Sequence, residues 1–198
     1  MTKKSIKIKS FYYGFPAIIV STIDPASQNV NIAPLSASFC VGDKLYIATS
    51  VKNNTHDNIV AGSDVVVNIP DFTLWEKVEQ LGRTTGSNVV PESKLSQGVA
   101  HCADKFSLSG LSSEPSDCVT PPRITECPLQ AECTVSDIIP RGNFTIVELE
   151  IVKTWVDDKI LNTEGTVINT EAWLPLIYKF REYDTTTPPL GFNFKHEK

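Results

Sequence analysis

The chain has 198 residues, of which 41% are hydrophobic, 21% charged and 9% aromatic, and this composition excludes disordered, collagen-like and low-complexity classes. Its net charge is −5 and its isoelectric point about 5.2, so we expect no surface for nucleic acid or anionic lipid. The length predicts one domain over residues 1–198 with its own core.

The cysteines and the N-terminus bear on the cellular compartment. The five cysteines are odd in number and contain no C-x-x-C pair, which argues against a disulfide scaffold or a zinc knuckle. The first apolar run, 16–20, is too short for a signal peptide, and no segment has the roughly 18 apolar residues of a membrane span. We therefore expect a cytoplasmic protein.

The first 70 residues predict a β-rich core, because β-branched and aromatic runs alternate with turn formers. The predicted strands are 17–23, 36–41, 45–50 and 65–69, with the second and third paired as a hairpin. A short helix over 55–61 fits between the last two strands, with Thr55 as its N-cap and Gly62 past its end.

A second, amphipathic helix is predicted to follow Asp71 and end at Gly82, with apolar residues at 72, 75, 78 and 81 that cover a sheet face. Residues 83–128 are rich in Gly, Ser, Pro and Thr and form a long excursion within the domain, with one short helical piece near 101–106. Further strands are predicted at 130–139, 145–156, 166–169 and 176–180.

These elements show no regular β-α-β alternation, and no G-x-G-x-x-G is present, so a Rossmann fold is disfavoured. The sequence predicts a mainly β protein, an antiparallel barrel or sandwich with a few appended helices.

Most chemistry-bearing residues favour structural interpretations. His56, His101 and His196 are far apart and lack metal-ligand spacing, so we expect no metal site, and no G-x-S-x-G marks a catalytic serine. Glu148 and Glu150 share one strand face, which would suit an acid/base pair but suits a solvated face better. The strand residues 36–41 include Cys40, which we expect to be a buried small apolar residue.

Two polar segments remain, 31–36 before one strand and 50–55 between a strand and a helix. Together they could hold a phosphate. Thr55 offers a hydroxyl beside unpaired backbone N–H groups at the helix start, Lys52 adds a positive charge, and Ser36 adds a second hydroxyl. A purely structural helix cap is the alternative interpretation.

The order of several short motifs resembles the flavoredoxin and flavin-reductase-like family. The motifs are N-I-A-P-L-S at 31–36, T-x-x-N at 55–58, V-N-I-P at 67–70, D-K-F at 104–106 with G-L at 110–111, P-P-R-I at 121–124, A-E-C at 131–133 and W-L-P-L-I-Y at 173–178. The resemblance covers roughly residues 10 to 180. It implies the FMN-binding split β-barrel, an antiparallel barrel of Greek-key type.

The resemblance also implies a homodimer that holds FMN near the subunit interface and transfers electrons through it. Residues 33–36 would line the flavin and its phosphoribityl chain, residues 50–52 would run along the isoalloxazine ring, and 54–55 would meet the phosphate. The full cofactor-binding set is Asn31, Ala33, Pro34, Leu35, Ser36, Ser50, Val51, Lys52, Asn54, Thr55 and Lys105. No catalytic side chain is implied. Asn68 is expected to satisfy backbone groups at a barrel corner.

The chain departs from the family pattern at two positions. Phe144 stands where relatives carry histidine after Gly-Asp or Gly-Asn, and Leu149 stands where they carry glycine. Phe144 removes a hydrogen-bond donor and Leu149 adds bulk, so the electron donor, NAD(P)H or a protein, stays open.

Three functional alternatives follow: a flavin-dependent oxidoreductase, a non-catalytic FMN-binding electron carrier or flavin-holding protein, and a scaffold whose flavin site has decayed. Within the excursion, Arg83, Asn88 and Lys94 are available to shape or cover the groove.

Overall fold

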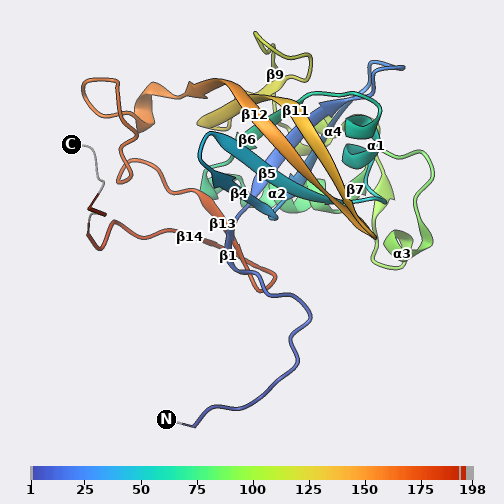
Figure 1. Cartoon of the computed structure of the whole chain (residues 1–198), viewed down its shortest axis with the longest axis horizontal. Coiled ribbons are helices and arrows are strands. Elements are labelled where there is room, and N and C mark those ends of the chain that lie inside the picture. Colours follow the sequence, from blue (N-terminus) through green and yellow to red (C-terminus); the bar gives the residue numbers. More distant parts are fainter. Residues whose placement is uncertain (1, 192, 195–198) are drawn as a thin grey trace.

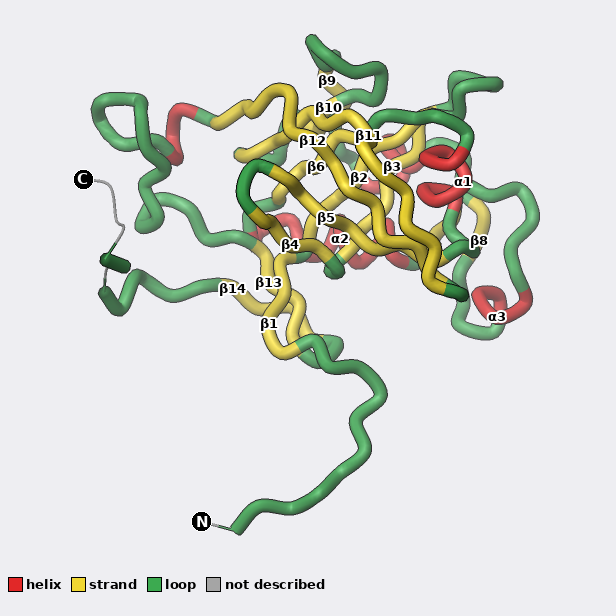
Figure 2. The backbone as a smooth tube through the Cα atoms, in the orientation of Figure 1, coloured by secondary structure: helices red, strands yellow, loops and turns green. Residues whose placement is uncertain are grey.

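The computed structural model describes residues 2–191, 193 and 194. Its body is one antiparallel sheet with the strand order β3-β2-β6-β11-β12-β5-β4 (Figure 2). The strands are β2 (Ile18–Ile23), β3 (Val30–Leu35), β4 (Ser38–Val41), β5 (Lys44–Ser50), β6 (Val65–Ile69), β11 (Leu129–Arg141) and β12 (Phe144–Val156).

The two edge strands of this sheet, β3 and β4, are joined by Ser36 and Ala37 alone. This short link forces the edges together, so the sheet curls into a barrel with a seam at residues 36–37. The N–H of Ala48 on β5 donates to the Ala37 carbonyl at 2.8 Å, which holds the link against the barrel. The predicted mainly β, split-barrel fold is confirmed.

A smaller sheet lies beside the barrel, with the order β1-β13-β14 (Figure 1). Its strands are β1 (Tyr13–Pro16), β13 (Leu176–Lys179) and β14 (Glu182–Thr185). The N–H of Ala17 donates to the Leu176 carbonyl at 2.9 Å and connects this sheet to the start of β2. Residues 2–11, which precede Tyr12 and β1, run away from the body.

Six helical segments are appended to the strands. They are α1 (Asn54–Val60), η1 (Phe72–Leu74), α2 (Trp75–Gly82), α3 (Glu92–Leu95), α4 (Lys105–Ser109) and η2 (Asp158–Ile160) in the described residues. Asp71 caps η1, since its carboxylate accepts from the Thr73 N–H at 3.0 Å. α1 starts earlier than predicted, so Thr55 as N-cap is wrong: Asn53 occupies that position and Thr55 lies inside the helix.

Two hydrophobic clusters fill the molecule, one on each face of β2. Residues facing into the barrel include Ile18, Val20, Leu45, Ile47, Val65, Val67, Val147 and Leu149. Residues on the other face, which pack against α2, include Ala17, Ile19, Ile32, Val78, Leu81, Leu111, Ile124 and Leu176. Because β2 is covered on both sides, its six residues are all buried, and α2 is fixed over the outer face of the barrel.

Asn68 lies fully buried on β6 and bonds to the backbone, as expected. Its Nδ2 donates to the Ile19 carbonyl at 3.1 Å, and its Oδ1 accepts from the Ile124 N–H at 2.8 Å. It therefore joins the excursion to the barrel.

Four details of the sequence interpretation need correction. Residues 166–169 form no strand, only a bridge between Leu161 and Ile168. β3, β1 and β14 were not predicted as strands. The excursion holds more structure than expected, with α3, α4 and the short strand pairs Thr84–Thr85 with Ala100–His101 and Ser113–Glu114 with Arg123–Ile124. Cys40 is exposed, because β4 is an edge strand at the seam.

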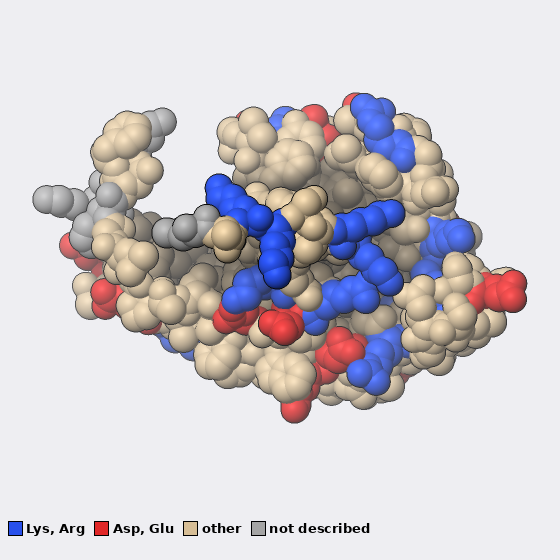
Figure 3. Space-filling view, turned by 90° about the horizontal axis from the view of Figure 1, so that it is seen from below, with Lys and Arg blue, Asp and Glu red and all other residues tan. Residues whose placement is uncertain are grey.

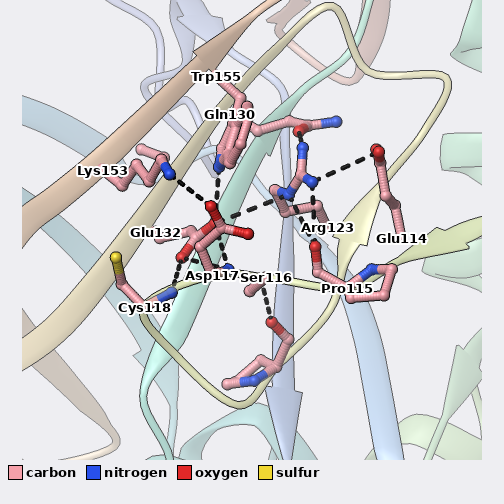
Figure 4. A network of polar contacts seen from close by, with 12 residues as sticks. Glu114, Pro115, Ser116, Asp117, Cys118, Arg123, Gln130, Glu132, Lys153 and Trp155 are labelled. Carbon is pink, nitrogen blue, oxygen red and sulfur yellow. Dashed lines mark hydrogen bonds and ion pairs between the residues drawn. The ribbon is translucent and has the colours of Figure 1, made fainter.

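The second half of the excursion is anchored by the buried carboxylate of Glu132 (Figure 4). It accepts from the N–H groups of Asp117 at 3.1 Å and Cys118 at 2.6 Å, and from Trp155 Nε1 at 2.7 Å. Arg123 Nε lies 3.7 Å away. Burial raises the pKa of Glu132, but these hydrogen bonds and the guanidinium outweigh burial and lower it, so the carboxylate is charged at neutral pH.

Candidate functional site

A cavity of about 390 Å³ opens at the barrel seam. One side of the cavity is formed by residues 36–37 and the adjoining ends of β3 and β5. Three tyrosines and one residue of α2 form the other side. The lining residues are Tyr12, Ala17, Pro34, Leu35, Ser36, Ala37, Ala48, Thr49, Ser50, Val78, Tyr178 and Tyr183. The irregular stretch between β3 and β4 leaves space that a continuous sheet would fill.

A second cavity of about 210 Å³ lies on the other side of Pro34, which lines both. Its walls come from β3, the start of α1, the end of α2 and the excursion. The lining residues are Asn31, Ala33, Pro34, Asn53, Asn54, Thr55, Leu81, Gly82, Thr84, Lys94, Val99 and Lys105. The two cavities together, here called the seam groove, suit an elongated ligand with two chemically different ends.

Asn31 supplies an unsatisfied acceptor in the smaller cavity. Its side chain is 4% exposed, and its Nδ2 donates to Thr55 Oγ1 at 3.1 Å. Its Oδ1 is buried and has no hydrogen-bond partner among the described residues. A buried acceptor without a donor costs about 1–3 kcal/mol, so a ligand hydroxyl or N–H placed here would recover that free energy.

At Gly86 the backbone of the excursion passes close to the side-chain amide of Asn31. A Cβ at Gly86 would lie 2.1 Å from Asn54 Oδ1 and 2.9 Å from Asn31 Oδ1. Asn54 is itself oriented by Asn58, whose Oδ1 accepts from the Asn54 Nδ2 at 3.2 Å. The excursion backbone thus approaches both amides closely because residue 86 has no side chain.

Lys105 places a buried amine in the same cavity. It is 4% exposed, and its Nζ donates to the Ile32 carbonyl at 3.0 Å. Burial lowers its pKa to about 8, an effect that nearby Cys102 opposes and Lys94 reinforces. Lys94 also lines the cavity, and burial lowers its pKa. Two amines in one small cavity favour an anionic ligand group.

The larger cavity has an aromatic wall. The ring centroids of Tyr12 and Tyr178 are 5.6 Å apart, and those of Tyr178 and Tyr183 are 5.9 Å apart. The Tyr183 hydroxyl donates to Glu79 at 3.1 Å, and burial together with this carboxylate raises the pKa of Tyr183. The rings meet edge to face, with interplanar angles of 72° and 61°, so the wall is uncharged and aromatic and can pack against an aromatic ligand ring.

Phe144 and Leu149, the two residues that differ from the family pattern, lie in different parts of the structure. Phe144 pairs with Ser50 across β12 and β5 and is 46% exposed, while the preceding Asn143 carbonyl accepts from the Val51 N–H at 3.2 Å. Phe144 therefore stands beside a groove residue. Leu149 packs in the barrel interior, so the expectation that its bulk would restrict approach to the site is wrong.

The structure brings most of the predicted cofactor residues into the seam groove. Those that line it are Asn31, Ala33, Pro34, Leu35, Ser36, Ser50, Asn54, Thr55 and Lys105. Val51 and Lys52 do not: Val51 bonds to Asn143, and Lys52 Nζ donates to Ser93 Oγ at 3.3 Å. Of the three excursion residues expected at the groove, only Lys94 lines it.

Sequence reasoning missed the tyrosine wall and Gly86. Tyr12, Tyr178 and Tyr183 come from three separate strands or their ends, and no local motif marks them as neighbours. Gly86 was missed because the glycines of residues 83–128 were interpreted only as loop formers.

The remaining candidates lie away from this groove. His101 Nδ1 is 3.0 Å from the Ser87 carbonyl, His56 faces Asp57, and His196 lies outside the described residues. Glu148 accepts from the Tyr46 hydroxyl at 2.9 Å and Glu150 pairs with Lys44, as on a solvated strand face. In the part of the chain that the structure describes, no group of three His, Cys, Asp or Glu could hold a metal ion, and no helix is long and apolar enough to cross a membrane.

Known proteins resemble this chain in sequence and in fold. YdfE of Bacillus subtilis (strain 168) is 32% identical over 197 residues, which cover 98% of this chain and 94% of that protein. The flavoredoxin of Desulfovibrio vulgaris (Miyazaki F) superposes with a TM-score of 0.81 at 22% identity and covers 98% of each chain. The flavoredoxin of Methanosarcina acetivorans gives a TM-score of 0.80 at 18% identity, covering 98% of this chain and 97% of its own.

A family model described as a flavin reductase like domain matches residues 11–187. The matched segment includes both cavities of the seam groove and the whole excursion. The chain therefore belongs to the flavin reductase-like family, and its function is a flavin-related redox function.

Proposed function

We propose that the seam groove binds FMN and that the protein is a flavin-dependent oxidoreductase that transfers electrons through this cofactor. The observation that carries the proposal is that two unlike cavities lie next to each other and share Pro34 as a lining residue. One has an aromatic wall, and the other is small and lined by two amines and by Asn31, whose amide oxygen is unsatisfied. FMN has the matching parts: a planar ring, a hydroxylated chain and a phosphate.

The smaller cavity would hold the phosphate and the ribityl chain. Lys105 and Lys94 supply positive charge, and Thr55 supplies a hydroxyl. Asn31 Oδ1 has no donor among the described residues and would accept a hydrogen bond from the ligand. A ribityl hydroxyl is such a donor, whereas a phosphate is only an acceptor. We therefore propose that Asn31 binds the ribityl chain of FMN and that the two lysines bind its phosphate.

The small volume of the second cavity favours a terminal phosphate over a dinucleotide. Thr84, Lys94 and Val99 of the excursion line the smaller cavity, whose volume is about 210 Å³. The adenosine part of FAD would have to pass these residues. This supports FMN as the resident flavin.

The larger cavity would hold the isoalloxazine ring between the seam and the tyrosine wall. When bound, the flavin supplies the redox chemistry, and the protein binds it, orients it and excludes water. Ser36 and Ser50 bring hydroxyls and backbone groups to the ring's polar edge, and Val78 packs from α2. No side chain of this cavity needs to act as a nucleophile.

Phe144 favours a second candidate function, a non-catalytic electron carrier. It is half-exposed beside Ser50 and offers no hydrogen bond at that end of the groove. A carrier would exchange electrons with a protein partner and would not oxidise NADH or NADPH. Steady-state oxidation of either nicotinamide by the FMN-loaded protein separates the two functions, because a carrier shows only the buffer rate.

The proposed placement is tested by comparing FMN with riboflavin, which lacks the phosphate. We expect Lys105→Met to weaken FMN binding at least about tenfold and to change riboflavin binding less than about twofold. Lys159→Met, an exposed lysine far from the groove in sequence, is the matched control. Equal losses for both flavins, or no binding of either flavin by the unmodified protein, would contradict the placement.

A further inference from the structure

Residues 87–99 form a loop whose two ends lie side by side. Thr84–Thr85, before the loop, pair in parallel with Ala100–His101, after it, and His101 Nδ1 lies 3.0 Å from the Ser87 carbonyl. The short helix α3 lies within the loop, and Figure 2 shows it between two loop stretches at the edge of the molecule. Compact surface loops with closed ends are Ω-loops, which frequently have a functional role.

This loop is weakly attached to the rest of the molecule. None of residues 86–100 is buried, and neither hydrophobic cluster includes any of them. The backbone hydrogen bonds of α3 and of the turn after it are made within the loop, as from the Val99 N–H to the Lys94 carbonyl at 3.1 Å. A segment with its own hydrogen bonds and few buried contacts can separate from the body at a small cost in free energy.

One side-chain contact joins the middle of the loop to the barrel. Lys52 Nζ donates to Ser93 Oγ at 3.3 Å, which is the one hydrogen bond in the described structure between residues 88–98 and the rest of the chain. Lys52 lies in the turn between β5 and α1 and does not line the seam groove. This predicted cofactor residue therefore contacts the loop and not the cavity.

The loop covers the smaller cavity of the seam groove, since Lys94 and Val99 line that cavity. Burial lowers the pKa of Lys94, an effect that the charge of Asp57 opposes, and Lys94 Nζ has no hydrogen bond or ion pair in the described structure. With the loop in this position, a partly desolvated ammonium group therefore lacks a partner, which costs free energy. An anion in the cavity would supply the partner.

The side of the molecule that carries α3 is rich in basic side chains. Figure 3 views the molecule from below and shows Lys and Arg side chains gathered across the middle of that face. Figure 1 places α3 on the same lower side. Clustered positive charge raises the local concentration of anions, although the net charge of the whole chain is −5.

We infer that residues 87–99 are a lid that opens to admit a phosphate-bearing ligand to the smaller cavity and closes with Lys94 on the phosphate. Lys52 is a positioning residue that holds the lid closed through Ser93. This role rests on the proposed function, in which the cavity takes the phosphate of FMN. Because the ligand contacts Lys94 only in the closed position, binding shifts the lid toward that position, and lid opening limits the rate at which FMN leaves.

The test follows tryptic cleavage after Lys94 in the full-length chain by mass spectrometry. A protease cuts the opened form of a segment, so the cleavage rate reports the population of the open lid. We expect Ser93→Ala to raise this rate about threefold in the flavin-free protein, since it removes the acceptor of Lys52. Ser96→Ala is the matched control, because the Ser96 hydroxyl donates to the Ser93 carbonyl inside the lid, and we expect a change below about 1.5-fold.

Ligands should close the lid. We expect saturating FMN to slow the cut after Lys94 at least about tenfold and to leave the cut after the exposed Lys159 within about 1.5-fold. Inorganic phosphate should also slow the cut after Lys94, because it supplies the same anion without the flavin. FMN release, followed by flavin fluorescence, should be about threefold faster in Ser93→Ala and in Lys52→Met and unchanged in Lys52→Arg, which keeps a donor for Ser93.

A cut after Lys94 that neither FMN nor inorganic phosphate slows, or equal rates of that cut in Ser93→Ala and Ser96→Ala, would overturn the lid. The proposed function fails by a different result. If FMN does not bind while inorganic phosphate still slows the cut, the lid stands and the flavin assignment falls.

Discussion

Two buried polar clusters border the excursion, and they differ in how completely their hydrogen bonds are met. Around Glu132, the carboxylate receives three N–H groups and an arginine, and Arg123 Nη1 in turn donates to Gln130 at 3.0 Å. In the seam groove, Asn31 Oδ1 has no donor among the described residues, and Lys105 Nζ bonds to one carbonyl.

The difference separates a structural cluster from a binding site. Buried polar groups are normally satisfied, and a satisfied network rigidifies the chain around it. The Glu132 cluster accordingly fastens residues 114–123 to the barrel. The seam groove holds polar groups at a cost that folding does not recover, which is expected where a ligand completes the hydrogen bonds.

Removing the centre of the satisfied cluster should have the largest effect. Glu132→Leu leaves the Arg123 guanidinium without its buried carboxylate and three N–H groups without acceptors, so we expect the free energy of unfolding to fall by about 3–5 kcal/mol. Chemical denaturation measures this. Glu150→Gln, on the exposed pair with Lys44, should cost under about 1 kcal/mol, and similar losses for both variants would contradict the comparison.

A methyl group at Gly86 should disturb the unsatisfied cluster. Gly86→Ala pushes the Asn54 amide, which lies 2.1 Å from the added carbon, and we expect FMN affinity to fall about tenfold. Gly191→Ala is the matched control, since its Cβ would meet nothing within 4 Å and the residue does not line the seam groove. Flavin titration measures both. If the two alanines behave alike, close approach at residue 86 does not shape the site.

The pH dependence of FMN binding should be smaller and tied to Lys105. Its folded pKa is about 8 against 10.5 for the free side chain, so the flavin-free protein gains stability as the pH rises from 8 toward 10.5. The charged amine of the flavin-free protein is lost as the pH passes through about 8, so FMN affinity should fall severalfold above pH 8. Lys105→Met should flatten this dependence, and an unchanged slope would exclude Lys105 as the phosphate partner.

The barrel strands could be predicted because their patterns are local. β6 matches its predicted range of 65–69, since a valine run ends at Pro70. β3 was missed because Asn31 and Pro34 interrupt its pattern, and an edge strand tolerates proline where a central strand does not. The prediction that Cys40 is buried was wrong for a related reason, because strand periodicity does not reveal which strand lies at the edge of the sheet.

The site could be predicted in part from contiguous motifs. The segment 31–36 and residues 54–55 both reach the seam groove, because each follows or precedes a barrel strand at the seam. Tyr12, Tyr178 and Tyr183 are brought together by pairing of the small sheet, a long-range event without a sequence motif. Their roles toward a flavin, like those of the predicted residues, stay predictions.

The most direct measurement of the central claim is the visible absorption spectrum of the purified protein during titration with FMN, followed by heat release and chromatography of the bound chromophore. We predict a perturbed flavin band that saturates at one FMN per chain and the release of unmodified FMN. A protein that stays colourless and leaves the spectrum of added FMN unchanged would contradict the assignment of the seam groove as the flavin site.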